Sequence, residues 1–224
     1  MSDTKESLSA AERAYRIIRS QILSGVHAPG TMLGEAALAA QIQVSRTTVR
    51  VALARLQDEG WILIYPKRGA IVQGVDERTI VELADARYLL ETTAVDRAPD
   101  QLRRRLAERL EVSIGQQRAA FDEGDVARFI DLTLAFHRGF VEAGDNRVML
   151  EMYSQLSDRH RFALFTIRHR LLERCGEIIA EHEMLLEHLR NGDGAAFADT
   201  LRGHIEENAS PSSPARDTSG FLEL

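Results

Sequence analysis

Residues 44–72 read VSRTTVRVALARLQDEGWILIYPKRGAIV, and this stretch decides the fold of the first part of the chain. Ser45 predicts the start of a helix, since a serine hydroxyl at the N-cap accepts a hydrogen bond from a free backbone N–H. Four apolar residues follow at helical spacing and would form its buried face: Val49, Ala52, Leu53 and Leu56. The pattern then changes to β-prone segments at 61–65 and 70–72 around a Pro-Lys-Arg-Gly turn, which predicts a hairpin with two cations at its tip.

Two further helices are expected before this stretch. Apolar spacing predicts an amphipathic helix over 9–24 and a short helix over about 35–41. The short helix is joined to the helix after Ser45 by a brief connection at 42–44, so the two form a helix-turn-helix, whose second helix enters the major groove of DNA. With the hairpin added, the expected fold is a winged helix-turn-helix.

Side chains at the start of the second helix and at the hairpin tip suit DNA recognition. The arginines can donate two hydrogen bonds to guanine, the threonines can contact bases or phosphate, and the hairpin cations can neutralise phosphates. The candidates are Arg46, Thr47, Thr48, Arg50, Lys67 and Arg68. A solvated arginine on a generic three-helix domain would look similar, so the prediction depends on the combined order of turn, cap and basic hairpin.

The segment from Gly25 to Val72 resembles the GntR family of bacterial transcription regulators. The matching pieces are Pro29-Gly30, Val44-Ser45-Arg46-Thr47, Val49-Arg50, Ala52-Leu53, Leu56 and Arg68-Gly69. The resemblance implies DNA contacts at Ser45, Arg46, Thr47, Thr48, Arg50 and the turn formed by Lys67, Arg68 and Gly69.

Charge is distributed unevenly along the chain. The 224 residues carry a net charge of −6, yet residues 1–75 hold 9 Lys and Arg against 6 Asp and Glu, whereas residues 76–224 hold 19 Arg against 28 Asp and Glu. A basic head and an acidic body indicate two units with different partners. We therefore predict a DNA-binding domain at 1–75, a second domain at 76–208 and a disordered Ser- and Pro-rich tail at 209–224.

The chain shows no sign of secretion or membrane insertion. Its single cysteine, Cys175, excludes an intramolecular disulfide framework and fits a reducing compartment. The first residues lack the apolar segment of a secretory signal, and no stretch approaches the roughly 18–20 apolar residues of a membrane span. These features predict a cytoplasmic protein that is not associated with a membrane.

Beyond residue 77 the pattern is helical, with no strand signal. Helices are expected at about 77–97, 100–122, 125–143, 146–169, 174–190 and 194–208. Six helices in about 130 residues predict an all-helical antiparallel bundle, whose sites lie in the core between facing helices. The whole chain is therefore expected to be mainly α.

Three histidines lie beside the apolar stripes of three different helices: His137, His182 and His204. A lone histidine in such a position is commonly a satisfied core residue, but three in one small bundle favour a metal site, since neutral imidazole is the commonest metal ligand. The residues alone leave both readings open. His160 is left unassigned.

This second part resembles the FCD ligand-binding domain of one GntR branch. The matching pieces are Arg87-x3-Glu91, Phe136-His137, Asn146, Glu181-His182, Gly192-Asp193, Ala198 and His204-Ile205. Metal-binding members use histidines at the positions of His137, His182 and His204, together with an aspartate one helical turn before the first. Thr133 occupies that position here, so three histidines alone would hold the divalent metal (zinc, nickel or manganese), or the site would be metal-free with Thr133 offering its hydroxyl to the ligand.

Two nearby residues bear on this departure. Asp131 lies about 120° around the helix from His137 and cannot simply replace the missing aspartate. The resemblance implies that Arg87 faces the effector pocket and pairs with a carboxylate, whereas the residues alone equally allow an i,i+4 ion pair between Arg87 and Glu91.

Together these features predict a homodimeric transcription regulator that reads an inverted repeat in double-stranded DNA and senses a small organic acid. The dimer is implied by the family and by the two-fold symmetry of such operators. One alternative is a three-histidine metalloenzyme, which would activate water, although no general base in an H-E-x-x-H pattern accompanies the histidines. Another is a regulator whose histidines bind the effector without metal, or only pack in the core.

Overall fold

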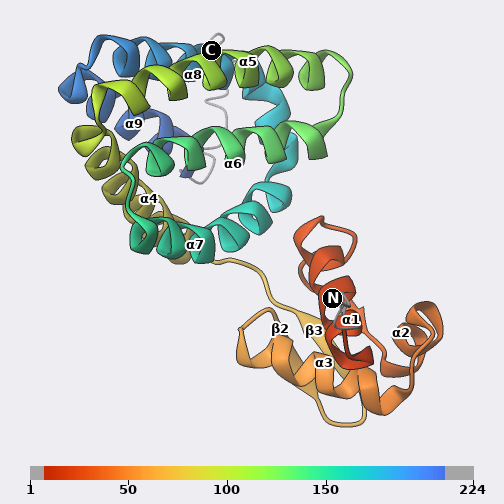
Figure 1. Ribbon diagram of the computed structural model, residues 1–224. Coiled ribbons are helices and arrows are strands. Elements are labelled where there is room, and N and C mark those ends of the chain that lie inside the picture. The colour runs from red at the N-terminus through yellow and green to blue at the C-terminus, as the bar shows by residue number, and fades with distance from the viewer. Residues whose placement is uncertain (1–7, 210–224) are drawn as a thin grey trace, which may run out of the picture.

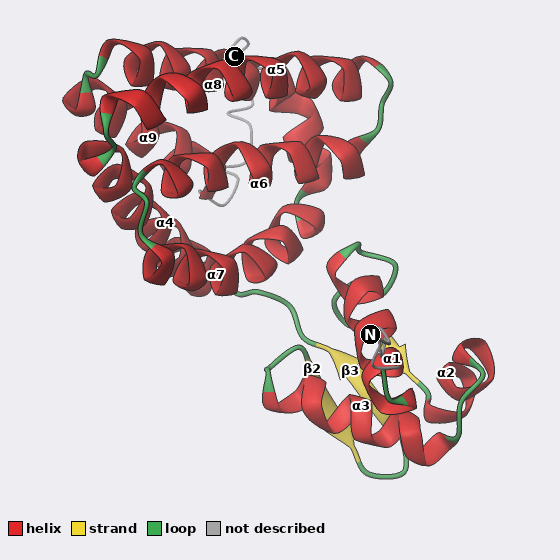
Figure 2. Ribbon diagram, in the orientation of Figure 1, coloured by secondary structure: helices red, strands yellow, loops and turns green. Residues whose placement is uncertain are grey.

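The computed structural model describes residues 8–209. Apart from Ala209, which ends the last helix, the tail predicted at 209–224 lies outside the described residues. Figure 1 shows two units joined by the segment after the last strand: a small head that contains all the described strands, and a larger body of helices. Figure 2 shows the same division by secondary structure.

The head is a winged helix-turn-helix, as predicted. Its elements are α1 (Ala10–Leu23), β1 (Met32–Leu33), α2 (Glu35–Ile42), α3 (Arg46–Asp58), β2 (Ile62–Tyr65) and β3 (Gly69–Val72). The three strands form an antiparallel sheet in the order β1-β3-β2. The sequence pattern missed β1, because two residues are too few to show the alternation of a strand.

Local chemistry explains where the head helices begin and how the wing turns. Ser9 caps α1 by accepting a hydrogen bond from the Glu12 backbone N–H (3.1 Å), and Ser45 caps α3 in the same way. At the wing, Gly69 has φ +112°, and a Cβ built there would lie 2.5 Å from the Leu33 carbonyl oxygen. Only glycine fits this close approach of β3 to β1.

The body is a bundle of six helices within the described residues. They are α4 (Glu77–Arg97), α5 (Asp100–Asp122), α6 (Val126–Ala143), α7 (Arg147–Thr166), α8 (Arg168–Asn191) and α9 (Gly194–Ala209). α5 packs against α6 and α8, while α4 packs against α6, α7 and α9 (Figure 1). None of the described helices has the length and apolar character needed to cross a membrane.

One predicted break in the body was wrong. The expected gap between 169 and 174 lies instead at Ile167, where α7 ends and α8 begins at the next residue. Neither glycine nor proline marks this position, so the sequence carries no local stop signal. Ile167 packs against the core of the body, and we attribute the bend to this packing.

The described residues form two hydrophobic cores. One lies in the head and the other lies between the helices of the body, but Phe162 of α7 is buried in the core of the head. The two units therefore meet at α7. The domain boundaries at residues 75 and 208 stay predictions.

Candidate metal centre and DNA interface

Three histidines meet in the core of the body. His137 comes from α6, His182 from α8 and His204 from α9, and one ring nitrogen of each lies within 4.8 Å of the other two. All three side chains are buried. Tertiary folding thus brings together residues that are 22 to 67 positions apart along the chain.

The partners of these histidines fix which nitrogen carries the proton. The Nδ1 atoms lie 2.8 Å from Glu91 Oε2, 2.7 Å from Gln117 Oε1 and 2.5 Å from Glu181 Oε2, for His137, His182 and His204 in turn. Each of these oxygens accepts a hydrogen bond, so Nδ1–H donates and the Nε2 lone pair is left free. The sequence did not indicate these three acceptors as partners, because each lies on a different helix from its histidine.

The free Nε2 atoms face one another. Nε2 of His137 lies 3.1 Å from Nε2 of His204, and Nε2 of His182 is buried without a hydrogen-bond partner. Two lone pairs at this distance repel unless a cation lies between them. Nitrogens bound tetrahedrally at about 2.0–2.1 Å from zinc are about 3.3 Å apart, close to the distance seen here.

Burial also sets the charge of this cluster. Removal from water lowers the pKa of His137 and of His182 well below the usual value, so both rings are neutral near pH 7. Neutral imidazole is the form that binds metal. These features fit a divalent metal site: the Nε2 of His182 has no partner, the rings of His137 and His182 are neutral, and each Nδ1–H is held by an oxygen. The three oxygens would be the supporting hydrogen-bond partners that metal-binding histidines require.

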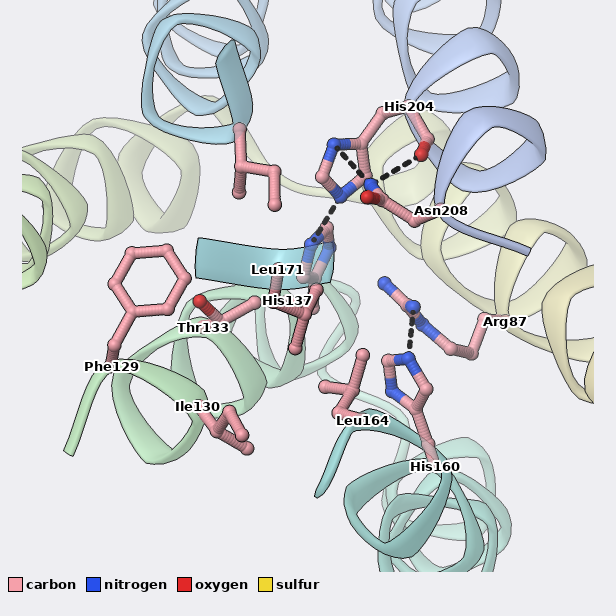
Figure 3. Close-up of a pocket in the computed structure, with 11 residues that line it drawn as sticks. Arg87, Phe129, Ile130, Thr133, His137, His160, Leu164, Leu171, His204 and Asn208 are labelled. Carbon is pink, nitrogen blue, oxygen red and sulfur yellow. Dashed lines mark hydrogen bonds between the residues drawn. The ribbon is translucent and has the colours of Figure 1, made fainter. Parts of the chain in front are cut away.

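A small cavity adjoins the cluster (Figure 3). Its volume is about 20 Å³, enough for about one water molecule. Three buried polar atoms that lack a partner belong to residues of its wall: Arg87 Nη2, Thr133 Oγ1 and His160 Nδ1. A wall rich in unpaired donors suits an anion.

Arg87 makes the i,i+4 pair with Glu91 and also lines the cavity. Its Nε donates to Glu91 Oε1 (3.1 Å), which makes the i,i+4 pair, and its Nη1 lies 2.9 Å from His160 Nε2 on the cavity wall. Glu91 is fully buried and also accepts a hydrogen bond from the Tyr153 hydroxyl. Asp131 is exposed and pairs with Arg161, so it does not replace the missing aspartate.

The candidate DNA contacts lie at the start of α3 and at the tip of the hairpin between β2 and β3. Arg46 and Arg50 project from the first turns of α3 with side chains 68% and 65% exposed. Thr47, Lys67 and Arg68 are exposed as well. The hydroxyls of Ser45 and Thr48 lie 2.8 Å apart at the cap of α3, and Gly69 closes the wing turn.

Glu35 contacts one of these candidate residues, and the sequence did not indicate this contact. Its carboxylate at the start of α2 accepts two hydrogen bonds from Arg50, from Nε at 3.1 Å and from Nη2 at 2.8 Å. A bidentate pair of this kind fixes the plane of the guanidinium. The contact joins the two helices of the helix-turn-helix, and nothing in the local pattern of either helix indicates it.

Comparison with known proteins decides the family. Residues 10–72 match the model of the bacterial regulatory proteins of the gntR family, and residues 82–207 match the FCD domain. The chain belongs to the GntR family of bacterial transcription regulators. As a GntR regulator with an FCD domain it binds DNA, and both resemblances noted in the sequence are confirmed.

Relatives of this GntR regulator agree with that assignment. It is 28% identical over 207 residues to the gluconate operon transcriptional repressor of Bacillus subtilis, covering 89% of this chain and 85% of the relative. It is 27% identical over 199 residues to the HTH-type transcriptional repressor RspR of Escherichia coli, covering 88% and 86%. These relatives are regulators, not enzymes, so the prediction that the chain is no enzyme is confirmed and the metalloenzyme alternative is wrong.

Two solved structures share the fold. The structure titled E. coli McbR/YncC has a TM-score of 0.71 at 25% identity, covering 90% of this chain and 96% of that one. A putative GntR regulator from Rhodococcus sp. RHA1 has a TM-score of 0.76 at 20% identity, with the same coverage. The predicted winged helix followed by a helical bundle is confirmed.

Proposed function

We propose that this GntR regulator senses a small organic acid at a divalent metal held by His137, His182 and His204. The buried, unpartnered Nε2 of His182 carries the proposal, because a buried acceptor without a partner is costly unless a ligand satisfies it. A bound metal would supply a Lewis-acidic position for a carboxylate oxygen. Zinc, nickel and manganese all accept imidazole ligands, so the donor set alone does not choose between them.

The protein's own residues would hold the rest of the acid. The Arg87 guanidinium is oriented by Glu91, and its free Nη2 supplies positive charge inside an otherwise acidic body. The Thr133 hydroxyl is a second free group in the cavity wall. A carboxylate between these groups would gain charge-assisted hydrogen bonds away from water.

Calorimetry with Zn²⁺ tests this site. Metal-free protein should bind about one Zn²⁺ per chain at micromolar concentration, and His182→Ala should abolish that binding. His188→Ala is the matched control, since His188 lies on the same helix outside the cluster. Undiminished binding by His182→Ala would refute the site.

A metal-free effector site is the second candidate. Thr133 stands where the metal-binding members carry an aspartate, which removes one negative charge from the donor set. Absence of Zn²⁺, Ni²⁺ and Mn²⁺ binding by the wild-type protein would favour this candidate. The three histidines would then contact the acid directly, with their Nε2 lone pairs accepting hydrogen bonds from its O–H groups.

At the other end of the molecule, we propose that a homodimer places two α3 helices on an inverted repeat. Arg46 and Arg50 would read guanine, while Lys67 and Arg68 of the wing would contact phosphates. The test uses a duplex that the protein selects from a random pool. Arg50→Ala should weaken binding by about 1–3 kcal/mol, whereas Arg78→Ala, on the exposed face of α4, should not; equal affinity for both variants would refute the assignment.

A further inference from the structure

One segment of α7, residues 158–165, faces both the cavity and the head. Residues two positions apart on a helix point about 200° from each other. His160 and Leu164 therefore share one face, and both line the cavity. Phe162 lies on the opposite face, where it is 1% exposed within the core of the head.

The head contacts of this segment centre on Trp61, the residue that precedes β2. The rings of Trp61 and Phe162 meet edge to face with centroids 5.9 Å apart. Arg159 places its guanidinium 5.6 Å from the Trp61 ring and donates a hydrogen bond to the Glu59 carbonyl oxygen (3.1 Å). Asp158 pairs with Arg19 of α1. A shift of α7 residues 158–165 would therefore disturb contacts with both α1 and Trp61 at the start of the wing.

The cavity contacts centre on His160. Its Nε2 accepts a hydrogen bond from Arg87 Nη1, so the proton is on Nδ1, which is buried without a partner. A second cavity of about 50 Å³ lies beside the first, and the two share four residues of their walls: Arg87, His160, Leu164 and Asn208. The bond between Arg87 and His160 therefore stands where the two cavities meet.

The size of these cavities limits what can enter without movement. The first cavity holds about one water molecule, whereas an organic acid has at least several heavy atoms. A carboxylate that pairs with both terminal nitrogens of Arg87 would take Nη1 as well as the free Nη2, and would therefore compete with His160 for Nη1. Release of His160 from Arg87 would join the two cavities. The part of the wall that moves would be α7 residues 158–165, which also carry the contacts with the head.

We propose that His160 is an effector-contacting residue and that α7 residues 158–165 transmit occupancy of the cavity to the head through Phe162 and Trp61. His160 Nδ1–H would donate to the acid once its bond to Arg87 is broken. This inference rests on the proposed effector site, but it does not require that the site hold a metal. An effector can act on DNA binding in this way only because its affinity differs between the two positions of α7.

A side chain that fills the cavity from within can stand in for the unidentified acid. Thr133→Met adds a longer, flexible side chain to the cavity wall. With chelator present to exclude metal, it should shift the emission of Trp61, the only tryptophan in the sequence. It should also change the dissociation constant for the selected duplex by about fivefold or more.

Removing His160 should reverse both effects, since it restores the lost space. Thr133→Met combined with His160→Ala is therefore compared with each single variant in a double-mutant cycle. Ala135→Met is the matched control, because Ala135 is exposed on the same helix. A Thr133→Met protein with normal circular dichroism, unchanged Trp61 emission and unchanged DNA affinity would overturn the proposal, as would failure of His160→Ala to reverse the change.

A second measurement covers the case in which Thr133→Met does not fold. Because coupling is reciprocal, DNA binding by the wild-type protein should shift the imidazole NMR signals of His160, and Phe162→Leu should reduce that shift. Unchanged His160 signals at saturating duplex would overturn the proposal. Loss of Zn²⁺ binding in the calorimetry above would instead count against the metal and leave this result standing.

Discussion

Glu91→Gln is expected to lower the free energy of unfolding of the body by about 3–5 kcal/mol. The Glu91 carboxylate is fully buried and holds three donors: Arg87 Nε at 3.1 Å, the Tyr153 hydroxyl at 3.2 Å and His137 Nδ1 at 2.8 Å. Burial raises the pKa of Glu91, and the guanidinium of Arg87 opposes that rise. Glutamine keeps the shape of the side chain but leaves the buried Arg87 without a counter-charge. An unpaired buried charge strongly destabilises the folded state.

A second substitution separates charge from packing. Arg87→Met in the Glu91→Gln background removes the unpaired cation, so the double variant should be more stable than Glu91→Gln alone. Glu82→Gln is the control, since Glu82 forms the same i,i+4 pair with Arg78 on the exposed face of α4 and should leave stability unchanged.

Urea denaturation in chelator is the assay. Far-UV circular dichroism follows mainly the helical body, and Trp61 fluorescence should report the same loss, since Trp61 packs against Phe162 of α7. A loss below about 1 kcal/mol for Glu91→Gln, within the range of ordinary substitutions, would refute the reasoning. So would a double variant no more stable than the single one.

Three other perturbations have defined outcomes. Burial lowers the pKa of His160 well below its usual value, so the unfolded chain binds one more proton and the free energy of unfolding falls as the pH drops below about 6.5. In urea denaturations across pH 5–7, His160→Gln should reduce the slope of the free energy of unfolding against pH by up to about 1.4 kcal/mol per pH unit. Glu35→Gln frees Arg50 and removes a negative charge near DNA, so fluorescence anisotropy should show tighter non-specific binding and a smaller ratio of specific to non-specific affinity. An unchanged ratio would count against the idea that Glu35 orients the Arg50 guanidinium. Gly69→Ala places a Cβ against the Leu33 carbonyl oxygen, so the Trp61-monitored unfolding of the head should show a loss of at least about 1 kcal/mol, and wild-type stability would mean that β1 can shift.

The head was predictable because its signals are local. Ser45 caps α3 where the sequence indicates, and the change from helical to β-prone spacing after Gly60 marks the wing. The same reasoning failed at Ile167 and at Met32–Leu33. There the bend and the strand exist because of contacts with distant segments, which leave no local pattern.

The candidate site was predictable only in part. Periodicity singled out three histidines beside apolar stripes, and the structure brings them together. It could not indicate the oxygens of Glu91 and Gln117, which come 46 and 65 residues before their histidines. His160 could not be assigned from the sequence for the same reason, since its partner Arg87 is 73 residues away.

Anomalous X-ray diffraction tests the central claim most directly. Crystals of the full chain grown with Zn²⁺ and measured at the zinc absorption edge should show a peak among the Nε2 atoms of His137, His182 and His204 in each chain. The body would then hold a metal where the structure leaves the His182 nitrogen without a partner. No peak at that position, with zinc bound elsewhere or not at all, would contradict the account.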